Sequence, residues 1–274
     1  MELKATCYEV ADGIATVTLN RPARMNAWTG RMHTEYRWII AQAEADAAVR
    51  VVIVTGAGRA FCAGADTQAL EGHVAKGGYD PGTPAELARP GYGVRPEFDA
   101  FFAWHFGLTK PVIAAINGAA AGVGFALACY ADLRFAASGA KFTAAHGRLN
   151  LPAEYGLSWL LPRMIGLTRA NDILLTSRKF LAEEALEMGL LNAVLPADQL
   201  MDHVRERAAE LIETIAPGSL ASTRQQIYAD LHRSVAESVV DSEARLERMM
   251  REPDFAEGVA ALVEKRPPRW MGPS

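Results

Sequence analysis

The sequence predicts an α/β protein whose chain ends in a helical subdomain. Strand and helix signals alternate through the first part of the chain, which is the pattern of an α/β architecture. Residues 51–55 form a continuous apolar run, as expected for a strand that is covered on both faces. From Ala197 onward, apolar residues recur at helical spacing. We therefore expect an α/β core over residues 1–196 and a helical region over residues 197–274.

The first elements of the core are a hairpin and an amphipathic helix. Asp12-Gly13 is a hairpin turn signal, and the β-branched run Ile14–Leu19 follows it. Apolar residues then recur at helical spacing over residues 32–47, in a helix that Thr29 opens. The buried strand at residues 51–55 comes next.

One apolar stretch, residues 112–131, is long enough to cross a bilayer. Most of it is alanine and glycine, which gain little on entering lipid, and Asn117-Gly118 is a turn-forming pair that divides it. We therefore predict a buried strand over Val112–Ile116, a turn, and a helix from about Gly122, instead of a membrane span.

Composition and charge exclude several classes of partner. The chain has 274 residues, half of them apolar, and 28 Lys+Arg against 32 Asp+Glu, for a net charge of −4. Slight acidity argues against nucleic acid or an anionic membrane as the main partner. The three cysteines are scattered and the histidines form no ligand pair, so we expect neither a disulfide nor a metal site. Without a secretory signal, the expected location is cytoplasmic.

Residues 72–98 interrupt the alternation of strands and helices. They hold many of the glycines and prolines of the chain. A connection of this length is a lid, a binding loop or a disordered surface segment, and the sequence leaves these alternatives open.

Two glycine-rich segments, each following a buried strand, are the candidates for chemistry. They are residues 59–66 and 117–124, and each leads through tiny side chains toward a helix. At a helix start the backbone amides have no intrahelical partner, and two such amides converging on one point form an oxyanion hole. The first segment is not a dinucleotide fingerprint, because Phe61 stands where the third glycine belongs. The alternative is that both are tight structural turns.

Four blocks of the sequence, two of which overlap these segments, form a distinctive set: Asn20-Arg21-Pro22…Asn26-Ala27, Phe61-Cys62-Ala63-Gly64-Ala65-Asp66, Lys110-Pro111-Val112-Ile113-Ala114-Ala115-Ile116-Asn117-Gly118, and Trp159-Leu160-Leu161-Pro162-Arg163. With these blocks, the sequence resembles the crotonase superfamily, the enoyl-CoA hydratase/isomerase family, along nearly the whole chain. The resemblance implies a spiral of β-β-α units, a C-terminal helical trimerisation region in residues 197–274, and an acyl-CoA site in residues 1–196. It also implies a homotrimer or a dimer of trimers, with coenzyme A as part of the substrate and no separate cofactor.

The resemblance also implies roles for individual residues. The backbone N–H groups of Ala65 and Val123 would polarise the thioester carbonyl and stabilise an enolate. The residues that resemble coenzyme A-binding positions of the family are Ala63 and Asp66 in the adenine-binding strip, and Arg24 and Lys265 near the phosphates.

The sequence departs from the hydratase pattern at both catalytic positions. Hydratases of this family use two glutamates, and the matching positions here are Ala126 and His146. Water addition requires one group that takes a proton and another that delivers one, which alanine cannot do. In the isomerase branch a carboxylate lies eight residues beyond the second position, and here that residue is Glu154. A single carboxylate in an apolar pocket suits an isomerase, which needs only one base.

We therefore expect double-bond isomerisation of an enoyl-CoA with Glu154 as the base. One alternative is an enoyl-CoA hydratase that uses Glu154 with His146 as acid or base. Others are a non-catalytic acyl-CoA-binding protein, a dehalogenase or a thioester hydrolase. The structural alternatives are that Glu154 caps or salt-bridges the next helix, and that His146 is a packed polar residue.

Overall fold

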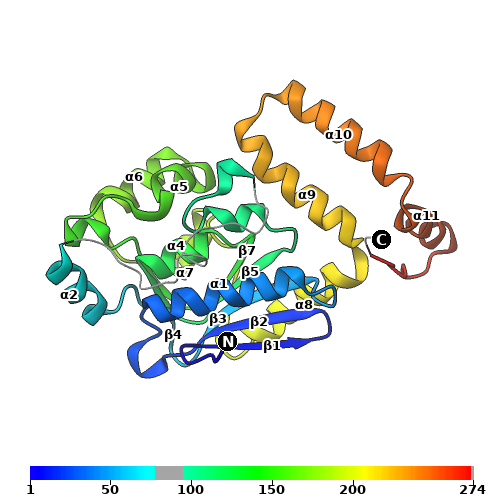
Figure 1. The fold of residues 1–274 in the computed structure, drawn as a ribbon. Helices are drawn as coiled ribbons and strands as arrows, with labels where there is room; N and C mark the ends of the chain where they lie inside the picture. Colours follow the sequence, from blue (N-terminus) through cyan, green and yellow to red (C-terminus); the bar gives the residue numbers. More distant parts are fainter. Residues whose placement is uncertain (78–94, 273–274) are drawn as a thin grey trace.

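Two β-sheets of unequal size form the centre of the computed structural model, which describes residues 1–77 and 95–272 (Figure 1). In the larger sheet only β1 and β2 pair antiparallel, while in the smaller sheet only β8 and β9 do. The larger sheet has the order β1 (Thr6–Ala11), β2 (Ile14–Leu19), β3 (Val51–Gly56), β5 (Val112–Ile116), β7 (Leu133–Ala137), β10 (Ala193–Leu195). The smaller sheet has the order β4 (Ala60–Cys62), β6 (Ala119–Ala121), β8 (Lys141–Thr143), β9 (Phe180–Leu181).

The helices lie around these sheets (Figure 1). The α-helices are α1 (Gly30–Ala45), α2 (Thr67–Lys76), α4 (Val123–Cys129), α5 (Leu157–Ile165), α6 (Leu167–Thr176), α7 (Ala182–Glu187), α8 (Leu200–Thr214), α9 (Pro217–Ala229), α10 (Val235–Met249) and α11 (Pro253–Glu264). Short 3-10 helices are η1 (Pro22–Arg24), η2 (Pro96–Phe98), η3 (Ala103–Gly107), η4 (His146–Leu149), η5 (Glu154–Gly156) and η6 (Asp230–His232). An α/β fold with a helical C-terminal region is therefore confirmed.

One structural pattern repeats along the chain: a strand of the larger sheet, a strand of the smaller sheet, then a helix. β3 and β4 precede α2, β5 and β6 precede α4, and β7 and β8 precede the turn η4. Because β4, β6 and β8 pair in parallel, their carboxyl ends meet at one edge of the smaller sheet. Ligands of parallel sheets bind outside such ends.

The predicted N-terminal elements are confirmed. Asp12 and Gly13 adopt the left-handed backbone conformation, with φ of 52° and 77°, and close the hairpin between β1 and β2. The Thr29 side chain accepts a hydrogen bond from the Met32 amide at 3.1 Å, which caps α1.

Strand β3 is buried on both faces, as its continuous apolar run predicts. Val52 and Val54 belong to the main core, which also contains the buried residues of α1. Val51 and Ile53 alternate to the other face and pack in a second core with α8. The sheet is therefore covered by helices on both sides.

The apolar stretch at residues 112–131 is divided as predicted. It forms β5, the short strand β6, and α4, which begins directly after Gly122. Among the described residues, no helix is both long and apolar enough to span a membrane. The interpretation of residues 59–66 and 117–124 as turns alone is wrong in one respect, because each contains a strand of the smaller sheet.

The Gly- and Pro-rich connection is described only at its two ends. Its first residues belong to α2, and η2 lies near its end. The alternatives of a lid, a binding loop or a surface segment concern residues 78–94, which lie outside the described residues.

A buried arginine attaches α9 to the core. The Arg224 side chain is 5% exposed, and its Nε lies 2.9 Å from the Asp132 carboxylate. Its terminal nitrogens donate to the backbone carbonyls of His105 at 2.6 Å and Leu108 at 2.5 Å. One guanidinium thus joins the end of α4, the segment around η3 and α9, and it satisfies carbonyls that α9 would otherwise bury.

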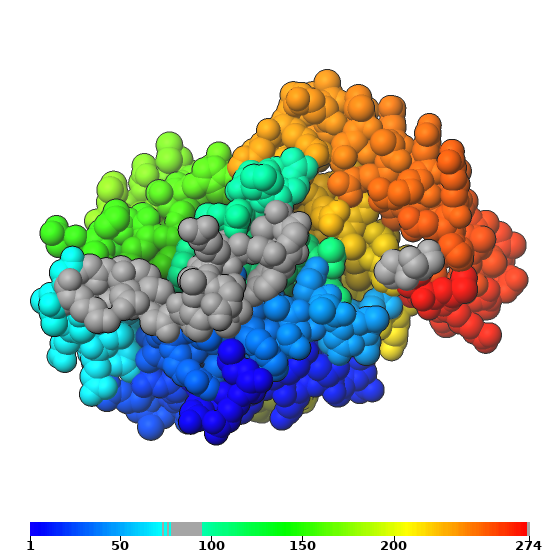
Figure 2. Space-filling view, viewed as in Figure 1, coloured from blue at the N-terminus to red at the C-terminus, as the bar shows by residue number. Residues whose placement is uncertain are grey.

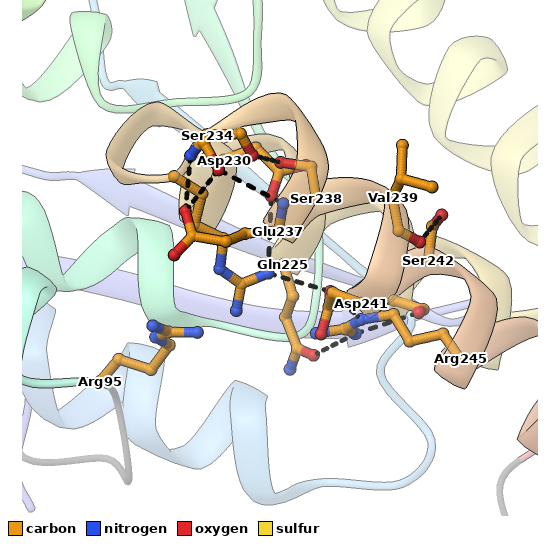
Figure 3. Close-up of polar contacts among 12 residues, drawn as sticks. Arg95, Gln225, Asp230, Ser234, Glu237, Ser238, Val239, Asp241, Ser242 and Arg245 are labelled. Carbon is orange, nitrogen blue, oxygen red and sulfur yellow. Dashed lines mark hydrogen bonds and ion pairs between the residues drawn. The ribbon is translucent and has the colours of Figure 1, made fainter.

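Helices α10 and α11 extend from the body of the protein as an arm, coloured orange to red in Figures 1 and 2. Polar contacts attach α10 to α9: Arg245 of α10 donates to Gln225 of α9 at 3.2 Å (Figure 3) and to Ser222 of α9 at 3.1 Å. Within α10, Asp241 accepts from Arg245 at 2.7 Å (Figure 3). Ser234 and Glu237 form a capping box at the start of α10 (Figure 3). Exposed large apolar side chains on the arm are Val235, Val239, Val240, Leu246, Met250, Phe255, Val259, Leu262 and Val263.

Replacing Arg224 with methionine is expected to destabilise the protein by about 3–5 kcal/mol, because it leaves Asp132 and the carbonyls buried without their partner. Urea unfolding measures this change. The control Arg207→Met removes an exposed ion pair with Glu210 and is expected to cost less than about 1 kcal/mol. Equal effects of the two substitutions would contradict this role of Arg224.

Candidate active site

Three residues predicted for the site follow the three parallel strands of the smaller sheet. Ala65 comes shortly after β4, Val123 after β6, and His146 after β8. Ala60 of β4 pairs with Ala119 of β6, and β6 in turn pairs with β8. The sheet therefore collects at one edge residues that are widely separated in the sequence.

Glycines allow the first two of these segments to touch. A Cβ atom built on Gly122 would lie 4.0 Å from the Cα atom of Gly64, and both glycines have positive φ, at 49° and 109°. A Cβ atom on Gly124 would lie 2.2 Å from the carbonyl oxygen of Cys62. The first turn of α4 thus packs directly on β4, at a distance that only glycine permits.

The backbone amides of Ala65 and Val123 lie where the described part of the chain offers them no hydrogen-bond acceptor. The Trp28 carbonyl accepts a hydrogen bond from the Asp66 amide at 2.9 Å, and the Trp28 amide donates to the Gly64 carbonyl at 2.8 Å. The Ala65 amide, between these two residues, takes no part in the pairing. Val123 is the first residue of α4, so its amide has no acceptor within the helix. Neither amide donates to an acceptor within the described part of the chain.

Asn26 organises the segment that precedes the site, a role that the sequence did not indicate. Its buried side-chain amide donates to the carbonyls of Ala57 at 2.9 Å and Ala60 at 2.7 Å. Its side-chain oxygen accepts from the Arg21 amide at 2.8 Å. The Asn26 side chain thus fixes the position of η1 relative to β4.

Two predicted coenzyme A-binding residues are paired with one another. The buried Asp66 carboxylate lies 2.9 Å from the Arg21 guanidinium and 3.5 Å from that of Arg24, and it accepts from the Gln68 amide at the start of α2. Burial raises the pKa of Asp66, but these hydrogen bonds and the two arginine charges outweigh it, so the pKa lies below its ordinary value. The Ala63 amide donates to a backbone carbonyl at 3.1 Å. Arg24 remains half exposed.

Glu154 and His146 lie close enough to interact electrostatically. Burial raises the pKa of Glu154, and the charge of nearby His146 opposes that rise. The half-buried Glu154 carboxylate neither caps α5 nor forms an ion pair within residues 1–77 and 95–272. His146 is buried, and its Nδ1 atom has no hydrogen-bond partner among those residues. The two side chains are therefore close enough in space for their charges to interact.

Aromatic rings from α1, from the segment before η3 and from η5, the turn that begins with Glu154, pack against one another. His33 stacks on Phe101 at 4.5 Å between ring centroids, Phe101 stacks on Tyr155 at 5.2 Å, and Trp28 packs edge-on against His33 at 6.1 Å. An apolar cavity of about 390 Å³ adjoins these rings. Its walls include Phe98, Phe101, Tyr130, Tyr155, Trp159 and His232.

Comparisons with known proteins assign this architecture. A family model described as enoyl-CoA hydratase/isomerase matches residues 9–273. The chain is 36% identical over 266 residues to a Rhodobacter capsulatus protein named "Probable enoyl-CoA hydratase", covering 97% of each chain. It is 35% identical to the 1,2-epoxyphenylacetyl-CoA isomerase of Escherichia coli, covering 96% of this chain and 97% of that one.

The chain belongs to the enoyl-CoA hydratase/isomerase family. The crystal structure of a probable enoyl-CoA hydratase/isomerase from Mycobacterium abscessus superimposes with a TM-score of 0.85 at 33% identity, covering 98% of this chain and 99% of that one. The crotonase fold with its C-terminal helical region is therefore confirmed. The relatives carry hydratase and isomerase names, so the family leaves the reaction open.

This family member lacks a carboxylate on α4. Ala126, at the position where the resemblance expects the first hydratase glutamate, is fully buried in that helix. No group of His, Cys, Asp and Glu side chains that could hold a metal ion occurs in the described part of the chain. Of the residues predicted to transfer protons, Glu154 and His146 lie close enough for their charges to interact.

Lys265 does not join the other predicted residues within one chain. It directly follows α11 and is exposed, and α11 is the labelled helix at the right of Figure 1. α2 and β4 lie at the opposite end of the molecule (Figure 1). A role for Lys265 in this enzyme would therefore require the arm of another copy.

The substitution Gly124→Ala is expected to force α4 away from β4, because the new Cβ would overlap the Cys62 carbonyl. Overpacking of this kind costs about 1–3 kcal/mol, and turnover of enoyl-CoA substrates should fall as well. Urea unfolding and substrate turnover measure the two effects.

The matched control is Gly72→Ala in α2, where no atom lies within 4 Å of the added Cβ. This change is expected to keep or slightly raise stability, by up to about 1 kcal/mol. The contact between α4 and β4 would lose its proposed importance if Gly124→Ala were as stable and active as Gly72→Ala.

Proposed function

We propose that this enzyme isomerises the double bond of an enoyl-CoA, with Glu154 as the proton-transferring base. The observation that supports this proposal is the half-buried Glu154 carboxylate, which has no ion-pair partner among residues 1–77 and 95–272, in a site whose helix α4 carries alanine at position 126. The raised pKa of Glu154 makes its carboxylate a stronger base than an ordinary glutamate, and an isomerase requires only one such group.

The proposed reaction uses the two unpaired amides to hold the carbonyl. Glu154 removes a proton from C2 of a 3-enoyl-CoA, and the electron pair delocalises onto the thioester oxygen. The amides of Ala65 and Val123 donate to that oxygen as it becomes negative. The protonated Glu154 then returns the proton to C4, so the double bond moves to between C2 and C3 and the base is regenerated.

Coenzyme A binding is proposed along the segment between η1 and α2. The Ala63 and Asp66 backbone would contact the adenine, and the half-exposed Arg24 guanidinium would meet the phosphates. Arg24 is available for this because its pair with Asp66 is the longer of the two, at 3.5 Å.

His146 supports a second candidate, hydration of a trans-2-enoyl-CoA. Its buried ring lies near Glu154 and has an unpartnered nitrogen within the described residues. One of the two groups would activate water and the other would protonate carbon. Assays that supply a 3-enoyl-CoA and a trans-2-enoyl-CoA in parallel distinguish the two reactions.

Glu154→Gln is expected to lower kcat for 3-enoyl-CoA isomerisation by about 10²–10⁴-fold, because an amide cannot take the proton. The variant should still bind acyl-CoA, which isothermal titration calorimetry would measure. In the wild-type enzyme, activity should fall as the pH drops through the raised pKa of Glu154, because the base must be ionised. That acidic limb should disappear in the variant.

The outcomes separate the candidates. His146→Gln should leave isomerisation within a few fold of wild type but abolish hydration if the pair adds water. Full activity of Glu154→Gln toward both substrates would overturn the assignment of the base. Tight acyl-CoA binding with no turnover by the wild-type protein would indicate a binding function instead.

We propose that the arm α10–α11 mediates assembly into a homotrimer or a dimer of trimers. Its exposed apolar side chains have no cover within the described part of the chain, while polar contacts hold α10 on α9. Many exposed large apolar side chains on one pair of helices are typical of an interface between subunits. A second copy would also bring Lys265 toward a neighbouring coenzyme A site.

Leu262→Asp is expected to reduce the mass of the assembly, because a charge replaces a side chain that is 80% exposed in the single chain. Size-exclusion chromatography with light scattering measures the mass. The control Leu175→Asp changes an equally exposed leucine of α6, at 82%, and should leave the mass unchanged. A monomeric wild-type protein would contradict the proposal.

A further inference from the structure

Glu154 begins a turn with an unusual backbone conformation. Tyr155, the next residue, has φ of 55° and ψ of 28°, and Gly156 follows with φ of 73° and ψ of 16°. Glycine adopts the left-handed region freely, whereas a bulky residue such as tyrosine rarely does. Such a conformation persists only where the surroundings impose it, and residues of this kind cluster at functional sites.

The hydroxyl of Tyr130 contacts this turn directly. It donates a hydrogen bond to the Tyr155 carbonyl oxygen at 2.6 Å. A Cβ atom built on Gly156 would lie 3.0 Å from the same hydroxyl oxygen, so the hydroxyl lies close against the turn. Burial raises the pKa of Tyr130 to about 12, so the hydroxyl remains a donor at any working pH.

Tyr130 itself is held rigidly. It is the residue that ends α4, and its amide donates to the Ala126 carbonyl at 3.1 Å. Its buried ring packs against Phe106 at 5.0 Å and stacks on Phe102 at 6.2 Å between centroids. A fixed aromatic side chain loses little conformational entropy when it forms one more hydrogen bond.

We propose that Tyr130 is a positioning residue that sets the place of the Glu154 carboxylate through its hydrogen bond to the Tyr155 carbonyl. The inference rests on the proposed function of Glu154 as the base. The helix α4 then determines the distance between the thioester carbonyl and the base, because Val123 starts it and Tyr130 ends it. A displacement of about 1 Å between a substrate and a catalytic group can cost about 100-fold in rate.

Tyr130→Phe removes the hydroxyl and keeps the ring. We expect kcat for isomerisation to fall about 10–100-fold, with KM changed less than about threefold, because positioning affects the reaction more than coenzyme A binding. The acidic limb of the pH profile should also move to lower pH, since a released turn exposes Glu154 to water and lowers its pKa.

The control is Tyr228→Phe, which removes another tyrosine hydroxyl hydrogen bond, to Asp132 at 2.5 Å. It should lose as much thermal stability as Tyr130→Phe or more, because its acceptor is charged, and yet keep kcat and the pH profile of wild type. A loss of kcat in both variants that followed their stability would show a purely structural role for Tyr130.

The double variant Tyr130→Phe/Glu154→Gln completes a double-mutant cycle with the two single variants. If Tyr130 acts through Glu154, the double variant should have the same kcat as Glu154→Gln alone. Additive losses of kcat in the double variant would overturn the role of Tyr130 and leave the proposed function intact. The same holds if Tyr130→Phe keeps the kcat and pH profile of wild type while Glu154→Gln is inactive. Full activity of Glu154→Gln would overturn the proposed function, and the positioning role with it.

Discussion

The candidate site depends on one close contact, between the first turn of α4 and strand β4. Gly124 lies so near the Cys62 carbonyl that any Cβ atom would overlap it. This contact places Val123 beside the turn that carries Ala65. Because backbone packs on backbone here, the arrangement is as rigid as the sheets that support it. The side chains of the site are added to that fixed frame.

Much of the fold could be predicted from local sequence patterns. The strand β3, the capped start of α1 and the division of the apolar stretch follow from periodicity, capping and turn residues, which act over a few neighbours. The strands β4, β6 and β8 could not be predicted in this way. Each has three residues and gains its pairing from segments far along the chain, as Ala60 does from Ala119. The repeated β-β-α pattern consequently depends on pairing between segments that are distant in the sequence.

The candidate site shows the same division. Glu154 and His146 were found from family spacing, and the structure brings them together. Asn26 and Tyr130 were not predicted to support the site, because their importance lies in the atoms they reach and not in their residue type. Asn26 bonds a carbonyl 34 residues away in sequence, and Tyr130 one that is 25 residues away. Only the folded chain reveals such contacts.

The proposed carbonyl-binding groups are main-chain amides, whereas the proposed proton carrier is a side chain. This difference has an evolutionary consequence. A point mutation, other than one to proline, cannot delete an amide, so thioester recognition would persist while mutations accumulate around it. The side chains at positions 126, 146 and 154, in contrast, change with single codons, and a few such changes could alter the reaction while the backbone amides stay in place. Hydratase and isomerase names among its relatives are consistent with a scaffold of this kind.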